Sequence, residues 1–419
     1  MNSRDQFLAE HADVTRRFFM QLGVAGTAAL GSWRSTSAES TPPLLEKAIA
    51  GLETYLTSQD SFRDVSRGDP IPHTLPEDER VKVGLTRDTW QMEVRGDPEN
   101  KPDLRTPLTK ENGTAFDFKA LMDMARDKAV RFPKVMTCNN IGCPLGMGIW
   151  EGVPLRDVIW KVQPRQNVRR LFYYGYHNDK PAQMFRSTMP IGRILEDPLG
   201  LPPVILCYKL NGEFLTPQRG GPVRIVVPEA YGFKSVKWIT DVVLTNLASA
   251  NDTYIGGNND IDSWLKTFAA TLSIPTEVKA GEPIPVTGYA QVGISGMSKV
   301  QVWVTPRDAE LPAGDRYFSK APWQDAIVLP PPKEWGGGLP DNTIPTPTRG
   351  FDPETGKPKT WPMLLSKAHW AALLPGLEEG EYTFRCRTVD QNGIGQPLPR
   401  PFRKSGSNAI EQVRVVVKG

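Results

Sequence analysis

The sequence predicts a mixed α+β domain followed by a β-sandwich of the immunoglobulin type. Short helical and strand-like segments follow one another up to about residue 250, which is typical of an α+β domain. From about residue 270 the chain instead alternates strand-like runs and turns over roughly 150 residues, the spacing of a sandwich. Proline and glycine number 39 and 37 of 419 residues, which suits short strands and turns better than a helical bundle. We therefore expect one domain at 41–268 and a second at 269–419.

The elements of the first domain follow from residue periodicity. Apolar residues recur at helical spacing in 41–60, 117–129 and 155–162. The 117–129 helix opens on an acidic residue, as helix starts often do. Strand-like runs are expected at 80–85, 132–138, 169–176, 202–212 and twice within 221–246.

The residue pattern of the second domain predicts strands and no helix. The strand-like runs are 274–293, 297–306, 379–393 and 411–419. The segment 329–362 is rich in proline and glycine and is expected to form a long loop.

The first 40 residues differ from the rest. Arg16 and Arg17 precede a short apolar stretch of small residues, with a small-residue cleavage site near Ala38. The stretch is too short to span a bilayer, so we expect a twin-arginine signal peptide over 1–40 and a periplasmic location. The alternative is an amphipathic first helix with a chance arginine pair.

Composition limits the partners. The formal net charge is only +3 and the basic residues are spread out, so nucleic acid is not expected as a ligand. No segment after the first 40 residues is apolar enough to predict stable membrane insertion. Cys207 and Cys386 stand alone in apolar strand-like runs and are expected to be buried packing residues.

The other two cysteines, Cys138 and Cys143, lie in the run MTCNNIGCPLGMGIW. Their spacing does not fit a C-x-x-C redox pair, a zinc knuckle or a haem attachment motif. Taken by itself, Cys138 could be a free core cysteine or the partner of Cys143 in a disulfide.

Three blocks in order carry a resemblance to a known family. They are the strand that ends in Cys138 and Asn139, the run WEGVPLRDVI at 150–159, and the run GPVRIVVPEAYGFKSVKWI at 221–239. Together they resemble the sulfite oxidase family of molybdenum–pyranopterin enzymes, over roughly residues 60–419. The runs CRTVDQNGIGQP and SGSNAIEQVRVVV resemble the immunoglobulin-like dimerisation domain of that family, which implies a homodimer.

The resemblance implies a molybdenum–molybdopterin cofactor with Cys138 as the single protein ligand to the metal. A thiolate is a soft ligand, which suits a metal already held by dithiolene sulfurs. The resemblance also places cofactor contacts at Arg219, Arg224, Ser235, Lys237, Thr188 and His177. The alternative for the charged members of this set is that they are solvated residues at strand ends.

The same resemblance implies an anion-binding substrate pocket. Arg403 matches a substrate arginine from the C-terminal domain, while Arg67 and Tyr254 match an arginine and a tyrosine with a one-residue slip in register. Sulfite oxidases have a further arginine five positions after the ligand cysteine, and here that position is Cys143. Losing that cation should cost about 1–3 kcal/mol of anion binding. Cys143 is either a second thiol facing the substrate or a small filler.

The expected reaction is oxidation of sulfite or of a sulfane group on a carrier protein by oxo transfer. Because the chain has no haem-binding motif, we expect the electrons to pass to a separate c-type cytochrome. The family also contains sulfane dehydrogenase subunits and reductases of oxidised methionine, so reduction of a sulfoxide or another oxyanion is an alternative. A third alternative is a secreted binding protein without the cofactor.

Overall fold

The computed structural model of the chain describes residues 42–140, 143–177, 184–249, 252–262, 264–311, 313–315, 318–396 and 400–419. The expected signal peptide over 1–40 lies outside these residues. No helix in the described ranges is both long and apolar enough to cross a lipid bilayer.

Helices in the described residues are few and short. The α-helices are α2 (Pro43–Ala50), α3 (Glu77–Lys82), α4 (Phe118–Lys128), α5 (Leu155–Ile159) and α6 (Ile191–Leu195). Single 3-10 turns occur at Pro72–Thr74, Trp160–Val162, Pro217–Arg219, Gly232–Lys234, Ile255–Gly257 and Pro340–Asn342. The predicted helix at 117–129 is confirmed as α4, and the Asp117 side chain caps it by accepting a hydrogen bond from the Ala120 amide at 2.7 Å.

Two helix and strand predictions were wrong. The run 80–85 was expected to be a strand, but Glu77–Lys82 is helical, with three acidic residues in its first turn and basic residues in its last. Those charges complement the helix dipole and outweigh the strand-like Val–Lys–Val alternation. The helix expected over 41–60 ends at Ala50, directly before Gly51, a residue that commonly follows a helix end.

The first half of the chain builds two sheets. Their strands are β1 (Gln91–Gly96), β3 (Phe116–Asp117), β4 (Val130–Thr137), β5 (Pro144–Pro154), β7 (Arg170–Gly175), β8 (Arg186–Pro190), β9 (Ile205–Leu210), β10 (Glu213–Phe214), β11 (Arg224–Val226) and β12 (Ile239–Thr245). One sheet has the order β3-β1-β12-β7-β8, and the other has the order β10-β9-β5-β4, with β11 also paired to β9. A small separate pair joins β2 (Asp103–Leu104) to β6 (Pro164–Gln166).

Apolar residues of both sheets share one core. It includes Val94, Ile149, Leu171, Leu206 and Val242, all of which are fully buried. The predicted strands at 132–138, 169–176 and 202–212 are confirmed as β4, β7 and β9, and the two within 221–246 as β11 and β12.

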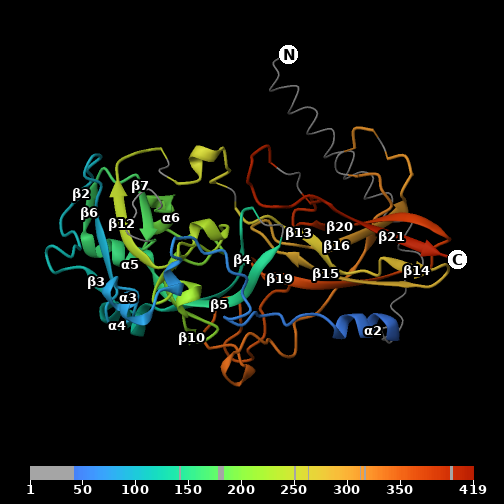
Figure 1. Cartoon of the computed structure of the whole chain (residues 1–419), viewed down its shortest axis with the longest axis horizontal. Coiled ribbons are helices and arrows are strands. Elements are labelled where there is room, and N and C mark those ends of the chain that lie inside the picture. The colour runs from blue at the N-terminus through green and yellow to red at the C-terminus, as the bar shows by residue number, and fades with distance from the viewer. Residues whose placement is uncertain are drawn as a thin grey trace, which may run out of the picture. The chain divides into compact units, whose positions relative to one another are not determined.

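The second half contains the strands β13 (Phe268–Ser273), β14 (Glu277–Lys279), β15 (Ile284–Gln291), β16 (Lys299–Pro306), β17 (Gln324–Asp325), β18 (Ile327–Val328), β19 (Lys367–Leu374), β20 (Gly380–Val389) and β21 (Glu411–Lys418). They form two sheets, with orders β13-β15-β19-β18 and β14-β21-β20-β16-β17. The longer strands run alongside one another in the yellow-to-red part of Figure 1. Val286 and Trp370 of one sheet share a core with Val302 and Phe384 of the other, so the two sheets pack as a sandwich.

The loop predicted at 329–362 has no strand longer than an isolated bridge, yet it is not loosely attached. Trp335, Ile344 and Phe351 are buried in the core of the first half. The Leu56 amide donates to the Trp335 carbonyl at 2.8 Å. The segment therefore joins the second half of the chain to the core that carries the site described next.

Candidate active site

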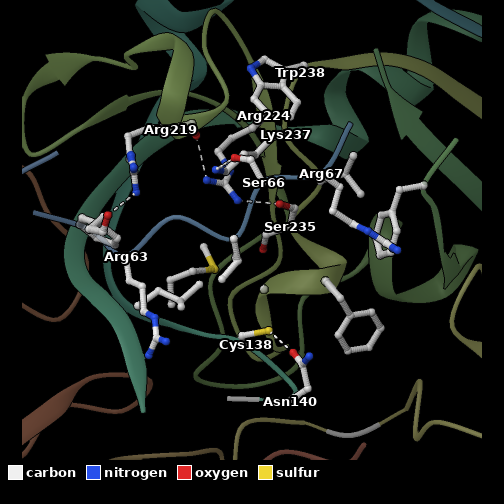
Figure 2. Close-up of a pocket in the computed structure, with 18 of the residues that line it drawn as sticks. Arg63, Ser66, Arg67, Cys138, Asn140, Arg219, Arg224, Ser235, Lys237 and Trp238 are labelled. Atoms are coloured by element: carbon white, nitrogen blue, oxygen red, sulfur yellow. Dashed lines mark hydrogen bonds between the residues drawn. The ribbon is translucent and has the colours of Figure 1, made fainter. Parts of the chain in front are cut away.

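The described residues enclose a pocket of about 340 Å³ around Cys138. Its described lining comes from 62–67, the end of β4 with the loop after it, β5, His177, Phe185, 219–238, Tyr254 and Lys404. Figure 2 shows Cys138 at one end of the pocket and the Arg219, Arg224 and Lys237 group at the other. Segments up to about 340 residues apart in sequence therefore meet at one cavity.

Cys138 reaches the pocket because β4 ends one residue before it. From Phe132 to Thr137 every residue of β4 is buried, so the strand is held on both faces and its end is fixed. The Cys138 side chain is partly exposed, and its Sγ donates to Asn140 Oδ1 at 2.5 Å. Cys138 and Cys143 are both free thiols, which excludes the disulfide alternative in this structure.

The second half of the chain fixes this strand end. Thr137 Oγ1 donates to Gln291 Oε1 at 2.6 Å, and Gln291 belongs to β15 of the sandwich. The Gly406 amide donates to the Asn139 carbonyl at 3.0 Å. Residues on both sides of Cys138 are thus held by hydrogen bonds from the sandwich and from the segment that precedes β21.

Arg219 and Arg224 lie buried at the inner end of the pocket. Arg224 donates from Nη1 to the Arg219 carbonyl at 2.8 Å and from Nη2 to the Ser235 carbonyl at 2.6 Å. Arg219 donates from Nη1 to the Phe62 carbonyl at 3.0 Å. Arg219 Nε and Nη2 and Arg224 Nε are buried without a hydrogen-bond partner among the described residues. Burial lowers the pKa of Arg224 to about 10, so it is charged at neutral pH.

Lys237 lies beside these arginines but is fully engaged. Its Nζ donates to Asp64 Oδ1 at 3.0 Å, to Ser66 Oγ at 2.7 Å and to the Gln218 carbonyl at 2.7 Å. Burial, followed by the nearby Arg224 charge, lowers the pKa of Lys237 to about 7. Gly220 permits this packing, since its φ is +96° and an added Cβ would lie 2.8 Å from Lys237 Cβ.

Ser235 completes the inner end. It is 2 % exposed and follows the 3-10 turn at Gly232–Lys234. Its Oγ accepts a hydrogen bond from the Val227 amide at 3.1 Å, which fixes the side chain while it lines the pocket.

The mouth of the pocket combines aromatic rings and cations. The Arg67 guanidinium lies 5.3 Å from the centre of the Phe185 ring, and Phe185 meets Tyr254 edge-on at 5.2 Å. Lys404 Nζ lies 5.3 Å from the Tyr254 ring centre. His177 also lines the mouth, and its pKa is lowered by burial and by the Arg67 charge. Burial and the nearby Cys138 raise the pKa of Tyr254.

Two predicted site residues do not lie in the pocket lining. Thr188 is buried within β8, where its Oγ1 donates to the Leu171 carbonyl at 2.9 Å, so its hydroxyl serves the sheet. Arg403 is exposed outside the lining, and the adjacent Lys404 takes its place at the mouth. The backbone direction at 403–404 explains this exchange, because the Arg403 amide donates to Asn258 while the next side chain faces Tyr254.

The other predicted residues, Cys138, Arg219, Arg224, Ser235, Lys237, His177, Arg67 and Tyr254, all line the pocket. The sequence analysis did not single out Arg63, Ser66, Asn140, Trp150 or Lys404, which line it as well. Trp150 had a usable signal, since it opens the run WEGVPL that carried the resemblance. Arg63 and Ser66 had none, because they lie in an irregular segment rich in charged residues.

The lining fits an anionic ligand. Among the described residues it contains the cations Arg63, Arg67, Arg219, Arg224, Lys237 and Lys404, and no aspartate or glutamate. Buried N–H groups without a partner are costly unless a ligand accepts from them. Arg219 and Arg224 together have three such groups, and the oxygens of a phosphate could accept hydrogen bonds from them. Cys138 supplies a thiol for a soft metal. These donors fit a phosphate-bearing pterin whose metal takes one protein sulfur.

Comparison with known proteins agrees with this fit. The oxidoreductase molybdopterin-binding domain matches residues 80–253. The chain is 27% identical over 322 residues to the sulfite oxidase of Gallus gallus, covering 70% of this chain and 64% of that protein. It is 25% identical over 235 residues to a nitrate reductase [NADPH] of Beauveria bassiana, covering 55% of this chain and 24% of that protein.

A solved structure shares the fold. The crystal structure of the sulfane dehydrogenase SoxCD from Paracoccus pantotrophus aligns with a TM-score of 0.59 at 16% identity, covering 92% of this chain and 94% of that chain. The matches to the nitrate reductases span about a quarter of their length. The matched domain and these relatives make the chain a molybdopterin-binding oxidoreductase of the sulfite oxidase type.

Proposed function

We propose that the chain binds molybdenum–molybdopterin in this pocket and oxidises a reduced sulfur compound, either sulfite or a sulfane group on a carrier protein. The observation that carries the proposal is the free Cys138 thiol at a fixed strand end, facing a cavity whose described lining has six cations and no carboxylate. Such a cavity suits both the phosphate of the cofactor and an anionic substrate.

Residues at the inner end of the pocket would bind the cofactor, and residues at its mouth would bind the substrate. Cys138 would hold the metal, and the unpartnered N–H groups of Arg219 and Arg224, with Ser235, would hold the pterin phosphate. When bound, the molybdenum supplies two-electron oxo-transfer chemistry. Arg67, Tyr254 and Lys404 at the mouth would bind the anion and neutralise its charge. The aromatic rings of Phe185 and Phe233 beside Tyr254 would restrict water around it.

Reduction of an oxyanion is the second candidate function, and the nitrate reductases among the relatives favour it. The same cations would hold nitrate or another small oxyanion, so charge alone does not separate the two directions of electron flow. A cofactor-free binding protein is the third, and it predicts well-folded protein without molybdenum.

The cellular setting is proposed on sequence grounds. Arg16, Arg17 and the apolar stretch after them support twin-arginine export to the periplasm, with the cofactor already inside the folded protein. A separate c-type cytochrome would accept the electrons, and the C-terminal sandwich would form a homodimer.

Expression in cells that make the cofactor tests this function. The purified protein should contain molybdenum and reduce an artificial electron acceptor when given sulfite, thiosulfate or a persulfide. Turnover of nitrate or sulfoxide with a reduced dye, and none with the sulfur donors, would favour the second candidate instead.

A further inference from the structure

Arg63 lines the pocket but has no role in the arrangement described so far. Its side chain is exposed at the mouth, and Nη1 donates to Cys143 Sγ at 3.3 Å. In the view of Figure 2, Arg63 lies on one side of Cys138 and Arg67 on the other. The two arginines thus approach the mouth from different sides.

The charge of Arg63 has no carboxylate partner among the described residues. Other arginines of this half do pair, such as Arg131 with Glu151 and Arg193 with Glu229. Cys143 accepts through its sulfur, which is a weak acceptor. Cys143 therefore orients the Arg63 guanidinium, which forms no ion pair with a carboxylate of the described residues.

The backbone around Arg63 is fixed, in contrast to an ordinary surface arginine. The Arg63 amide donates to the Leu145 carbonyl at 2.9 Å, on the strand that follows the cysteine loop. The preceding Phe62 is buried edge-on against Trp150, with ring centres 5.8 Å apart. The following Asp64 is bound to Lys237. A fixed backbone with a guanidinium directed to the mouth is the arrangement of a ligand-binding residue.

We propose that Arg63 is a further substrate-binding residue that selects for an anion, and that Cys143 is its positioning residue. The inference rests on the proposed function and narrows its substrate class to anions. Position 143 is where the resemblance leads one to expect an arginine, and here a guanidinium from another segment lies against the cysteine at that position. Arg63 of the 62–67 segment therefore provides a cation at the place where the cysteine loop has none.

Four variants test the pair: Arg63→Ala, Cys143→Ala, the double variant Arg63→Ala with Cys143→Arg, and the control Arg165→Ala. Arg165 is exposed and lies outside the pocket lining. Each protein is checked for thermal unfolding and molybdenum content. KM and kcat for sulfite are then measured, and equilibrium binding of sulfate is followed by tryptophan fluorescence, because Trp150 and Trp238 line the pocket.

Arg63→Ala should raise KM for sulfite and weaken sulfate binding by about tenfold or more, with a smaller change in kcat, since a charge-assisted hydrogen bond is lost. Cys143→Ala should shift both in the same direction by about two- to threefold, because a weak contact is lost. The double variant should regain part of the loss. Equal KM and equal sulfate affinity in Arg63→Ala and Arg165→Ala would overturn the proposal, as would a double variant no better than Arg63→Ala.

The two proposals fail in different ways. If molybdenum-loaded protein oxidises no sulfur compound, the proposed function is wrong, and sulfate binding still decides the role of Arg63. Weaker sulfate binding in Arg63→Ala would then still support Arg63 as an anion-binding residue, and unchanged binding would contradict it.

Discussion

Lys237 Nζ donates to Asp64 Oδ1 across 3.0 Å, and this ion pair joins the irregular 62–67 segment to the turn that carries Ser235. Asp64 does not itself line the pocket, so it fixes one cation without placing negative charge on the cavity wall. Burial would raise the pKa of Asp64, but the hydrogen bond from Ser66 and the charge of Lys237 outweigh it and hold the carboxylate ionised. The pair sets the charge of the inner pocket, and pH should alter it.

Sulfate affinity of the cofactor-free protein should fall as pH rises from 6.5 to 8.5. Lys237 is protonated and positive below its pKa of about 7 and neutral above it, so the pocket loses one positive charge in this range. The pKa of Arg224 is about 10 and those of His73 and His177 are lowered, so these groups change little there. The expected loss is about tenfold.

Tryptophan fluorescence at constant ionic strength measures this change. Lys237→Met should bind sulfate weakly at every pH in the range. A wild-type affinity that stays flat from pH 6.5 to 8.5 would show that Lys237 does not titrate there.

Arg224→Ala should lower the free energy of unfolding by about 2–4 kcal/mol, because the Arg219 and Ser235 carbonyls lose their buried donor. Molybdenum retention should fall with it. Arg224→Lys keeps the charge but cannot reach both carbonyls, so its loss should be intermediate. Urea denaturation and metal analysis give both quantities, and a change in Arg224→Ala below about 0.5 kcal/mol would contradict the buried arrangement.

Removing the carboxylate of the Lys234–Asp252 ion pair should lower the stability of the protein strongly. The Nζ–Oδ2 distance is 3.1 Å and the Asp252 side chain is fully buried. Asp252→Ala leaves a buried ammonium and removes the acceptor of the Tyr254 amide, so the free energy of unfolding should drop by about 3–5 kcal/mol. Asp252→Asn keeps an acceptor and should lose less. Urea denaturation compares the two variants, and a loss below about 0.5 kcal/mol in Asp252→Ala would contradict a buried ion pair at this position.

Gln291→Leu should loosen the Cys138 strand end, because Gln291 is the sandwich residue that accepts from Thr137. The free energy of unfolding should fall by about 1–3 kcal/mol, and iodoacetamide should modify Cys138 faster in cofactor-free protein. Thr137→Val removes the other side of the same bond. The double variant should be no less stable than the worse single variant, whereas fully additive losses would mean that the bond does not couple the two residues.

The fold was largely predictable where local pattern and burial agree. The strand at 130–137 is mostly apolar and is buried from Phe132 to Thr137, and the helix at 118–128 has a capping aspartate. The segment 80–85 was not predictable from its alternation, because its helix depends on acidic residues that lie before it. The packing of Trp335 and Phe351 into the first core depends on contacts distant in sequence, which no local pattern reports.

The site was predictable where its residues belong to strands and motifs. Cys138, Arg224 and Lys237 follow the runs that carried the resemblance, and all three line the pocket. Arg63 was missed because its place depends on the fold of an irregular segment. Arg403 lies outside the lining while Lys404 lies in it, since register in a loop is set by backbone hydrogen bonds such as that from the Arg403 amide to the Asn258 carbonyl.

The central claim is that Cys138 is the protein ligand to molybdenum, and X-ray absorption at the molybdenum edge tests it most directly. Wild-type protein from cofactor-competent cells should contain about one molybdenum per chain, with one more sulfur neighbour than the dithiolene supplies. Cys138→Ser should lose that sulfur, while Cys143→Ser should keep it. A sulfur count that is unchanged in Cys138→Ser, or well-folded wild-type protein without molybdenum, would contradict the account.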